Sequence, residues 1–297
     1  MIKVTFLGTS DAIPSAERNH TSILLEYKDE NILIDCGEGT QRQFRKAKLN
    51  PNKITKILIT HWHGDHVLGL AGLLQTLAFS NYNKTLNIYG PRGTKEFMNI
   101  LLRTFAFQGK YKINIEEVEN KFFENKEFYL EAEKMTHGTP CNAYAFVKKG
   151  SLRIDKKKLE KTNLKGPILK KLKEGKDITY NGKKYLAKNL TYGEDSKKVS
   201  FVFDTSFNKN IVPFVKNSDL LVCESTFGEE LEDKADEYRH LNVNHTANIA
   251  KKSKSKKLVL THISQRYSKN PKRILDAARK IFKNSMLVKD LDEIEVK

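Results

Sequence analysis

Short apolar segments alternate with turn residues along most of the chain. Segments of strand length are bounded by Gly, Asn, Asp or Pro and lie at 2–8, 21–27, 31–37, 54–60, 86–91, 128–137, 143–149, 198–206, 220–226 and 257–264. Segments with helical periodicity lie at 37–49, 68–79, 94–106, 246–254 and 271–282. Hairpin-like strand pairs come early and strand–helix units come late. This order predicts an α/β protein whose sheets are covered by helices.

The stretch 150–194 departs from this pattern. Residues 155–164 and 166–177 read as two short helices separated by Gly166 and Pro167, and a proline suits the first turn of a helix. Ile168, Leu169 and Leu172 form one short apolar stripe, and most of the rest is lysine. We therefore expect one domain spanning 1–297, with 150–194 inserted as a projecting basic two-helix arm.

The charge is concentrated in the same region. The chain carries a net charge of +17, and residues 148–198 hold 17 Lys and Arg against 6 Asp and Glu, which is +11 of that total. A localised surplus of this size indicates an anionic partner, and nucleic acid is favoured over a membrane because no basic amphipathic anchor is visible. The alternative is a lysine-rich solvated surface, which composition alone leaves open.

Cysteine usage and hydropathy indicate a cytoplasmic protein. The three cysteines, Cys36, Cys141 and Cys223, are far apart and odd in number, which argues against a disulfide framework. No apolar run approaches the ~20 residues that a membrane-spanning helix needs. The amino-terminal segment does not have the pattern of a signal peptide.

The segment "ILITHWHGDHVLGL" at 57–70 places His61, His63, Asp65 and His66 directly after an apolar strand. Imidazole and carboxylate groups at these spacings suit a divalent metal such as zinc. The first two histidines can point to one position and the other two residues to a neighbouring one, which would serve two metals ~3.5–4 Å apart. A histidine-rich surface turn is the alternative, and the apolar runs on both sides of Gly64 disfavour it.

Three further ligand-type residues follow predicted strands, as do ligand sites on many α/β sheets. They are His137, Asp204 and His262. Each alone could be a satisfied core or capping residue. Together with the histidine segment, they favour a single metal site.

In order and context, "HWHGDH", His137, Asp204 and His262 resemble the motif set of the metallo-β-lactamase superfamily. More narrowly, the chain is similar to the ribonuclease Z family of tRNA 3′-processing endonucleases. The stretches that carry this likeness are "FLGTSDAIPS", "LIDCGEGTQRQ", "IYGP", "FVFDTS", "ESTF", "LTHISQRY" and "VKDLDEIEV". The resemblance implies an αββα sandwich and covers nearly the whole chain.

Residue by residue, the resemblance implies two zinc ions per chain. His61, His63 and His137 would bind one zinc, and Asp65, His66 and His262 would bind the other, with Asp204 bridging. Asp35 would support the ligand loop as a carboxylate behind the ligands.

The resemblance also implies a general acid. In the family, a histidine that begins a His-Ser-Thr motif lies 22 residues before the last ligand, and the same count back from His262 reaches His240. The sequence has His-Leu-Asn at this point, and His245 falls where the family has a nonligand helix residue. Glu224 matches the glutamate of the family's His-Glu-Ala-Thr loop, in which Cys223 replaces the histidine.

The implied reaction is cleavage of precursor tRNA after the discriminator base, which leaves a 3′-hydroxyl on the tRNA. A metal-bound hydroxide would attack the phosphodiester, with Asp65 orienting it. His240 would protonate the leaving oxygen, and Glu224 would orient His240.

The insertion resembles the family's flexible arm, a tRNA-binding exosite. Its expected tRNA contacts are Lys165, Gly166, Pro167, Lys170, Lys171 and Lys173. Such lysines contact phosphates without reading sequence. The family's arm clamps tRNA bound to a partner subunit, so the resemblance also implies a homodimer.

Two other function classes remain as alternatives. A small-molecule hydrolase of the same superfamily, of thioesterase or lactonase type, would need no basic arm. A nucleic-acid-binding module with a structural zinc would close its site with four ligands, and seven candidates are present here.

Overall fold

The computed structural model describes all residues 1–297, and they form two compact units. The larger unit comprises 1–123, 130–146 and 198–297, and the smaller comprises 124–129 and 147–197. No helix of the chain is long and apolar enough to cross a membrane.

A seven-stranded sheet forms one half of the larger unit, in the order β18-β1-β2-β3-β4-β5-β6. β18, β1, β2 and β3 pair antiparallel, whereas β3 to β6 pair parallel. The strand bounds are β1 (Ile2–Gly8), β2 (Ser22–Tyr27), β3 (Glu30–Ile34), β4 (Lys56–Leu58), β5 (Leu86–Gly90), β6 (Ile113–Glu117) and β18 (Glu293–Val296). The early hairpin-like strands predicted from the sequence are therefore the antiparallel half of this sheet.

The second seven-stranded sheet has the order β17-β16-β15-β14-β9-β8-β7. Its strands are β7 (Asn120–Glu124), β8 (Phe128–Met135), β9 (Cys141–Lys148), β14 (Lys197–Val202), β15 (Leu220–Glu224), β16 (Leu258–Thr261) and β17 (Ser285–Leu287). β14 to β17 run parallel, as expected for the strand–helix units of the last third.

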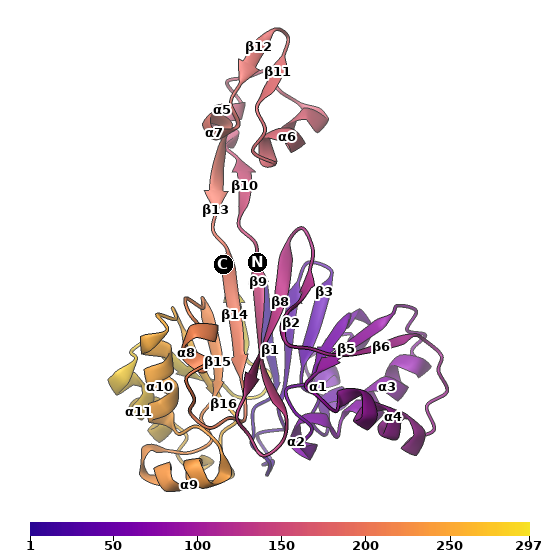
Figure 1. Cartoon of the computed structure of the whole chain (residues 1–297), viewed down its shortest axis with the longest axis vertical. Coiled ribbons are helices and arrows are strands. Elements are labelled where there is room, and N and C mark those ends of the chain that lie inside the picture. Colours follow the sequence, from indigo (N-terminus) through magenta and orange to yellow (C-terminus); the bar gives the residue numbers. More distant parts are fainter. The chain divides into compact units, whose positions relative to one another are not determined.

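Helices cover the outer faces of both sheets (Figure 1). The first sheet carries α1 (Thr40–Lys46), α2 (Gly64–Val67), α3 (Leu70–Phe79) and α4 (Thr94–Thr104), and the second carries α8 (Ile211–Phe214), α9 (Glu232–Tyr238), α10 (Val243–Lys252) and α11 (Lys272–Ile281). One buried apolar cluster joins the first sheet to α1, α3 and α4, and another joins the second sheet to α10 and α11.

The inner faces of the two sheets pack on each other. The Tyr144 hydroxyl of β9 donates a 2.8 Å hydrogen bond to the carbonyl of Ile59, just beyond β4. The rings of Tyr27 in β2 and Phe146 in β9 meet edge to face, with centroids 5.5 Å apart. The αββα sandwich that the sequence predicts is confirmed.

The smaller unit contains more structure than the two helices expected at 150–194. It holds β10 (Ser151–Ile154), α5 (Lys156–Leu159), a 3₁₀ turn at Gly166–Ile168, α6 (Leu169–Lys173), β11 (Ile178–Tyr180), β12 (Lys183–Tyr185), α7 (Ala187–Leu190) and β13 (Thr191–Glu194). β10 pairs with β13 and β11 with β12, both antiparallel. Gly166 has φ +76°, a conformation that favours glycine, and Pro167 follows in the first turn of the 3₁₀ helix.

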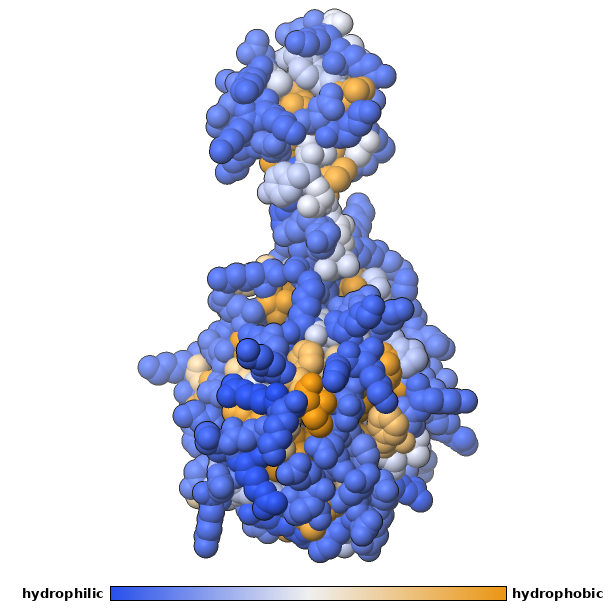
Figure 2. Space-filling model, turned by 90° about the vertical axis from the view of Figure 1, so that its left-hand side faces the viewer, coloured by the Kyte–Doolittle hydropathy of each residue, from blue (hydrophilic) through white to orange (hydrophobic).

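A small apolar core also holds this unit together, although its sequence is too polar to suggest one. Leu164, Leu172, Ile178, Ala187 and Leu190 are buried against one another. The surface of this unit is predominantly hydrophilic (Figure 2). The arm is therefore a folded element with a charged exterior.

Candidate metal centre

His61 lies three residues after the end of β4, and α2 begins at Gly64 in the same segment. His61 and His66 are buried, whereas His63 is exposed. The His66 carbonyl accepts a hydrogen bond of 2.8 Å from the Cys36 amide, and the Cys36 carbonyl accepts one of 2.9 Å from Gly69. These bonds join the segment to the loop after β3. The backbone that carries the histidines is therefore fixed at the ends of both β3 and β4.

Asp35 fixes this segment from behind. Its carboxylate is fully buried and accepts hydrogen bonds of 2.7 Å from the Thr60 amide, the Thr60 hydroxyl and His66 Nδ1. With Nδ1 engaged, the Nε2 atom of His66 is directed to the opposite side, where the other ligand-type residues lie. The sequence predicted this supporting role for Asp35, and the contacts are those the role requires.

The seven predicted ligand residues form two groups, and Glu224, His240 and His262 form a third beside them. His61, His63, His137 and Asp204 make the first, and their donor atoms lie within 4.8 Å of one another. His61 Nε2 and His137 Nε2 lie 3.1 and 3.2 Å from His63 Nδ1.

The second group is Asp65, His66, Asp204 and His262, with donor atoms again within 4.8 Å of one another. His66 Nε2 lies 3.2 Å from Asp65 Oδ2 and 3.3 Å from His262 Nε2. The Asp204 carboxylate belongs to both groups, because Oδ2 lies 3.4 Å from His61 Nε2 and Oδ1 lies 3.2 Å from His262 Nε2.

In four of the histidines, a contact of the Nδ1 atom fixes the orientation of the ring and leaves Nε2 facing the site. His61 Nδ1 and His262 Nδ1 meet the hydroxyls of Thr60 and Thr226 at 3.1 and 2.8 Å. His137 Nδ1 donates to the Arg239 carbonyl at 3.1 Å, and His66 Nδ1 contacts the Asp35 carboxylate. This is the arrangement found around metal-bound imidazoles, in which an acceptor on one nitrogen leaves the other free to bind.

The electrostatics also fit a cation. Burial and the neighbouring imidazoles hold the pKa of His61 well below its ordinary value, and burial lowers the pKa of His137, so both are in the neutral form that binds metals. Burial raises the pKa of Asp204, but the surrounding histidines outweigh it and hold that pKa well below its usual range. Asp204 Oδ1 is buried without a hydrogen bond. Converging imidazole nitrogens and a buried ionised carboxylate are what a divalent cation stabilises.

Three of these residues have left-handed backbone conformations, which non-glycine residues rarely adopt. Asp35, Asp204 and His262 have φ values of 56°, 38° and 55°, and each follows the end of a parallel strand. Such conformations cost on the order of 1–3 kcal/mol each and gather at functional sites. Here they turn the side chains inward at the sheet edge.

Beside the second group lies a histidine–carboxylate pair. His240 Nδ1 lies 3.0 Å from Glu224 Oε2, and the fully buried Glu224 also accepts hydrogen bonds from the Thr226 hydroxyl at 2.6 Å and the Thr205 amide at 2.8 Å. Burial lowers the pKa of His240, but the carboxylates of Glu224 and Asp204 outweigh it and raise the pKa to about 9. Both carboxylates therefore favour the protonated form of the imidazole.

The two histidines of the "RHLNVNH" segment lie in different surroundings. The His240 ring lies 5.2 Å from the His137 ring and 5.6 Å from the His262 ring, centroid to centroid. His245 lies in the first turn of α10, stacks on Phe207 at 5.3 Å and faces Glu232. The departure from His-Ser-Thr is accommodated because Leu241 is buried in the second core, and Asn242 caps α10 by accepting from the His245 amide.

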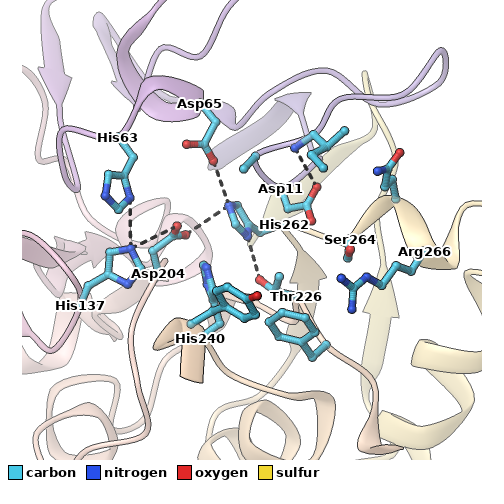
Figure 3. Close-up of a pocket in the computed structure, with 15 residues that line it drawn as sticks. Asp11, His63, Asp65, His137, Asp204, Thr226, His240, His262, Ser264 and Arg266 are labelled. Carbon is cyan, nitrogen blue, oxygen red and sulfur yellow. Dashed lines mark hydrogen bonds and ion pairs between the residues drawn. The ribbon is translucent and has the colours of Figure 1, made fainter. Parts of the chain in front are cut away.

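A cavity of about 370 Å³ opens above both groups (Figure 3). It is lined by Asp11, Ala12, Ile13, His63, Asp65, His137, Asp204, Thr226, Phe227, Tyr238, His240, His262, Ser264, Gln265 and Arg266. His245 does not line it. The six candidate arm contacts, Lys165, Gly166, Pro167, Lys170, Lys171 and Lys173, lie in the smaller unit, and all are exposed.

Comparison with known proteins gives relatives along nearly the whole chain. The ribonuclease Z of Nanoarchaeum equitans is 36% identical over 99% of this chain and 93% of its own. The ribonuclease Z of Methanothermobacter thermautotrophicus is 38% identical over 100% of this chain and 97% of its own. The chain belongs to the ribonuclease Z family.

Solved structures agree with ribonuclease Z membership. The short form of human tRNase Z has 26% sequence identity and a TM-score of 0.73, and the match covers 99% of both chains. A metallo-β-lactamase fold protein from Bacillus subtilis, YhfI, also has a TM-score of 0.73, but its 18% identity shows the fold alone. A family model described as "Anti-Pycsar protein Apyc1" matches residues 2–139. Ribonuclease Z membership, together with the two donor groups, implies a metal cofactor.

Sequence reasoning left several cavity residues without a role. Thr226 and Arg266 lie within the quoted stretches "ESTF" and "LTHISQRY", but nothing in these stretches indicates which side chains face the site. Tyr238 comes from α9, a helix that the apolar pattern did not predict. Its first turn is acidic and only Ala235 is buried, so α9 has almost no apolar stripe.

Proposed function

We propose that this protein is a zinc-dependent endoribonuclease that removes the 3′ trailer from precursor tRNA. It cuts after the discriminator base and leaves a 3′-hydroxyl on the tRNA. Membership of the ribonuclease Z family supports this activity. The proposal rests chiefly on the position of Asp204. Its carboxylate belongs to both donor groups, and the residue lines one open cavity.

In this proposal, His61, His63 and His137 would hold one zinc ion, Asp65, His66 and His262 would hold a second, and Asp204 belongs to both donor groups. Five imidazoles and two carboxylates are a donor set that suits zinc better than magnesium or calcium, which prefer oxygen ligands. When bound, the two ions supply an acidified water and neutralise charge on the phosphoryl oxygens.

The chain's own residues then have separate tasks. Asp65 orients the attacking water, whose oxygen adds to phosphorus while the bond from phosphorus to the 3′-oxygen breaks. The protonated His240 donates its Nε2 proton to that leaving oxygen, because Nδ1 is occupied by Glu224. The tRNA keeps the resulting 3′-hydroxyl, and the trailer carries the phosphate on its 5′ end.

The smaller unit, which contains the predicted arm at 150–194, is proposed to bind tRNA. Its support is the exposure of Lys165, Lys170, Lys171 and Lys173 on a surface with few acids. Amino groups on flexible stems attract phosphates without reading bases, as recognition of a common tRNA shape requires.

The homodimer and the cytoplasmic location stay predictions from the sequence. A thioesterase or lactonase of the same superfamily would need neither the exposed lysines nor the His240–Glu224 pair at a leaving oxygen. Mapping the products of a 3′-extended precursor tRNA separates the two activities.

A further inference from the structure

The cavity above the donor groups has a second wall that the proposed metal chemistry does not use. Phe227, Tyr238, Arg266 and Ile13 line it. Arg266 and His137 lie on opposite sides of the cavity, with His262 and His240 between them (Figure 3). This wall is therefore beside the donor groups and separate from them.

Phe227 is the buried ring of this wall. Its ring is 6% exposed and lies 6.2 Å from the Tyr238 ring at an interplanar angle of 22°, which is a stacked arrangement. The Arg266 guanidinium lies over the same ring at 5.8 Å. Tyr238 itself is 54% exposed, so one flat aromatic surface remains open above a fixed aromatic base.

The supports of this wall are rigid. Phe227 follows β15, and the next amide, Gly228, donates a 2.7 Å hydrogen bond to the Tyr267 hydroxyl. Tyr267 shares a 3₁₀ turn with Arg266 and donates to Glu230 at 3.0 Å. These hydrogen bonds link the turn that carries Arg266 to the backbone beside Phe227, and Tyr238 stacks on the Phe227 ring.

Arg266 is the one arginine or lysine that lines this cavity. Arg266 is exposed and forms no ion pair. Asp11 is the one acid of the cavity outside the donor groups, and its Oδ1 is occupied by the Ile13 amide at 3.1 Å. The Ile13 side chain, which also lines the cavity, is 52% exposed. An aromatic face, an apolar side chain and an unpaired guanidinium suit a nucleobase and its phosphate.

We propose that this wall is the subsite for the discriminator base, which stacks on Tyr238 with Arg266 at its edge. The proposal rests on the proposed function, and His240 sets the direction of the strand. His240 protonates the 3′-oxygen that leaves, and this oxygen belongs to the discriminator nucleotide. The Phe227 ring lies 6.0 Å from the His240 ring, so the aromatic wall is on the side of that nucleotide.

A second cavity gives the trailer a path on the other side. It measures about 580 Å³, shares the lining residue His137 with the first cavity and includes Arg92 and Lys134 among its other lining residues. An endonuclease must hold the strand on both sides of the scissile phosphate. Because every nucleobase has a π face, stacking on Tyr238 tolerates any base at the discriminator position, which one enzyme for many tRNAs requires.

The test asks whether the effect of removing the Tyr238 ring depends on the base at the discriminator position. Single-turnover cleavage by the zinc-loaded protein is measured on precursor tRNA and on the same RNA made abasic at the discriminator or at the first trailer position. Tyr238→Ala should slow cleavage of intact RNA on the order of ten- to a hundred-fold, the range of one lost stack. On the RNA that is abasic at the discriminator, wild type and Tyr238→Ala should be equally slow. Tyr238→Phe should match wild type throughout.

Phe79→Ala is the matched control, because Phe79 is 76% exposed and lies outside the cavity. It should cleave all three RNAs as wild type does. The subsite is refuted if the Tyr238→Ala defect persists in full on the RNA abasic at the discriminator. It is assigned to the wrong nucleotide if the defect disappears only on the RNA abasic in the trailer.

Failure of the proposed function would look different. A protein that cuts no precursor tRNA contradicts that function, and the subsite is then tested by binding alone. The probe is precursor RNA with 2-aminopurine at the discriminator and a methylene in place of the scissile 3′-oxygen. Stacking predicts fluorescence quenching by wild type and Tyr238→Phe but not by Tyr238→Ala, and equal signals from all three would overturn the subsite.

Discussion

His240 Nδ1 lies 3.0 Å from Glu224 Oε2, and this contact decides which nitrogen of His240 faces the cavity. Glu224 is fully buried at the end of β15 and is itself held by Thr205 and Thr226. The pair therefore has the fixed geometry that the proposed proton donor needs beside the second donor group. His245 is half-buried, and its acidic partner is the exposed Glu232, so it has no comparable support.

His240→Ala should lower the cleavage rate by roughly two or more orders of magnitude, the usual contribution of a general acid. Metal content should not change, because His240 belongs to neither of the donor groups that share Asp204. His245→Ala is the control and should retain nearly the wild-type rate. A large loss for His245→Ala with a small loss for His240→Ala would show that these roles are reversed.

His63→Ala should abolish cleavage with little effect on the fold. The side chain is exposed, so its removal leaves no buried cavity, but it contacts both His61 and His137. Metal analysis should find about two zinc equivalents in wild type and fewer in the variant. Circular dichroism should find the same secondary structure in both. A fully active His63→Ala protein contradicts the ligand assignment.

Gly69→Ala should disturb the ligand segment through the backbone. A Cβ at Gly69 would lie 2.1 Å from the carbonyl oxygen of Gly37, so α3 and the loop after β3 must separate. We expect a loss of several kcal/mol of unfolding free energy and weaker zinc binding. Gly72→Ala in the same helix meets only the end of the Gln41 side chain and should be nearly neutral in thermal unfolding. Equal effects of the two substitutions would contradict this packing argument.

Replacing residues 152–192 with a short Gly-Ser linker should weaken tRNA binding and flatten its dependence on salt. Each phosphate contact contributes about 0.7–0.9 log units of affinity per log unit of salt. The larger unit should stay folded, because the small core of the arm is separate from the two cores of the sandwich. Hydrolysis of a small chromogenic phosphodiester should survive.

Equal impairment of tRNA cleavage and small-diester hydrolysis in a folded deletion variant would show that the arm is no tRNA clamp. A charge-reversal variant, with Lys170, Lys171 and Lys173 changed to Glu, keeps the arm and provides the matched comparison. It should reproduce the loss of tRNA affinity.

The sequence predicted the ligand-type residues because strand ends are readable from apolar patterns. His61, Asp204 and His262 each follow a run of buried strand residues, and the structure brings them together. Local pattern could not give the contacts between distant segments. His66 and His262 are 196 residues apart in sequence, and the left-handed backbone of Asp35 depends on its buried partners.

The same limit applies to the arm and to the cavity wall. The strands of the arm are three or four residues long and have few fully buried positions, so they are too short for a polar–apolar alternation to predict them. Tyr238, which lines the cavity, is the last residue of α9, and the left-handed φ of 58° at Arg239 ends the helix there. Neither the short strands of the arm nor the end of α9 produces a periodic pattern of apolar residues in the sequence.

The proposed activity is tested most directly by the cleavage of a 3′-extended precursor tRNA by the zinc-loaded protein, with both product ends mapped. We predict one cut after the discriminator nucleotide, a 3′-hydroxyl on the tRNA, a 5′-phosphate on the trailer, and no cut by His63→Ala. Intact precursor after incubation with wild type, or a trailer that carries a 5′-hydroxyl, would contradict it.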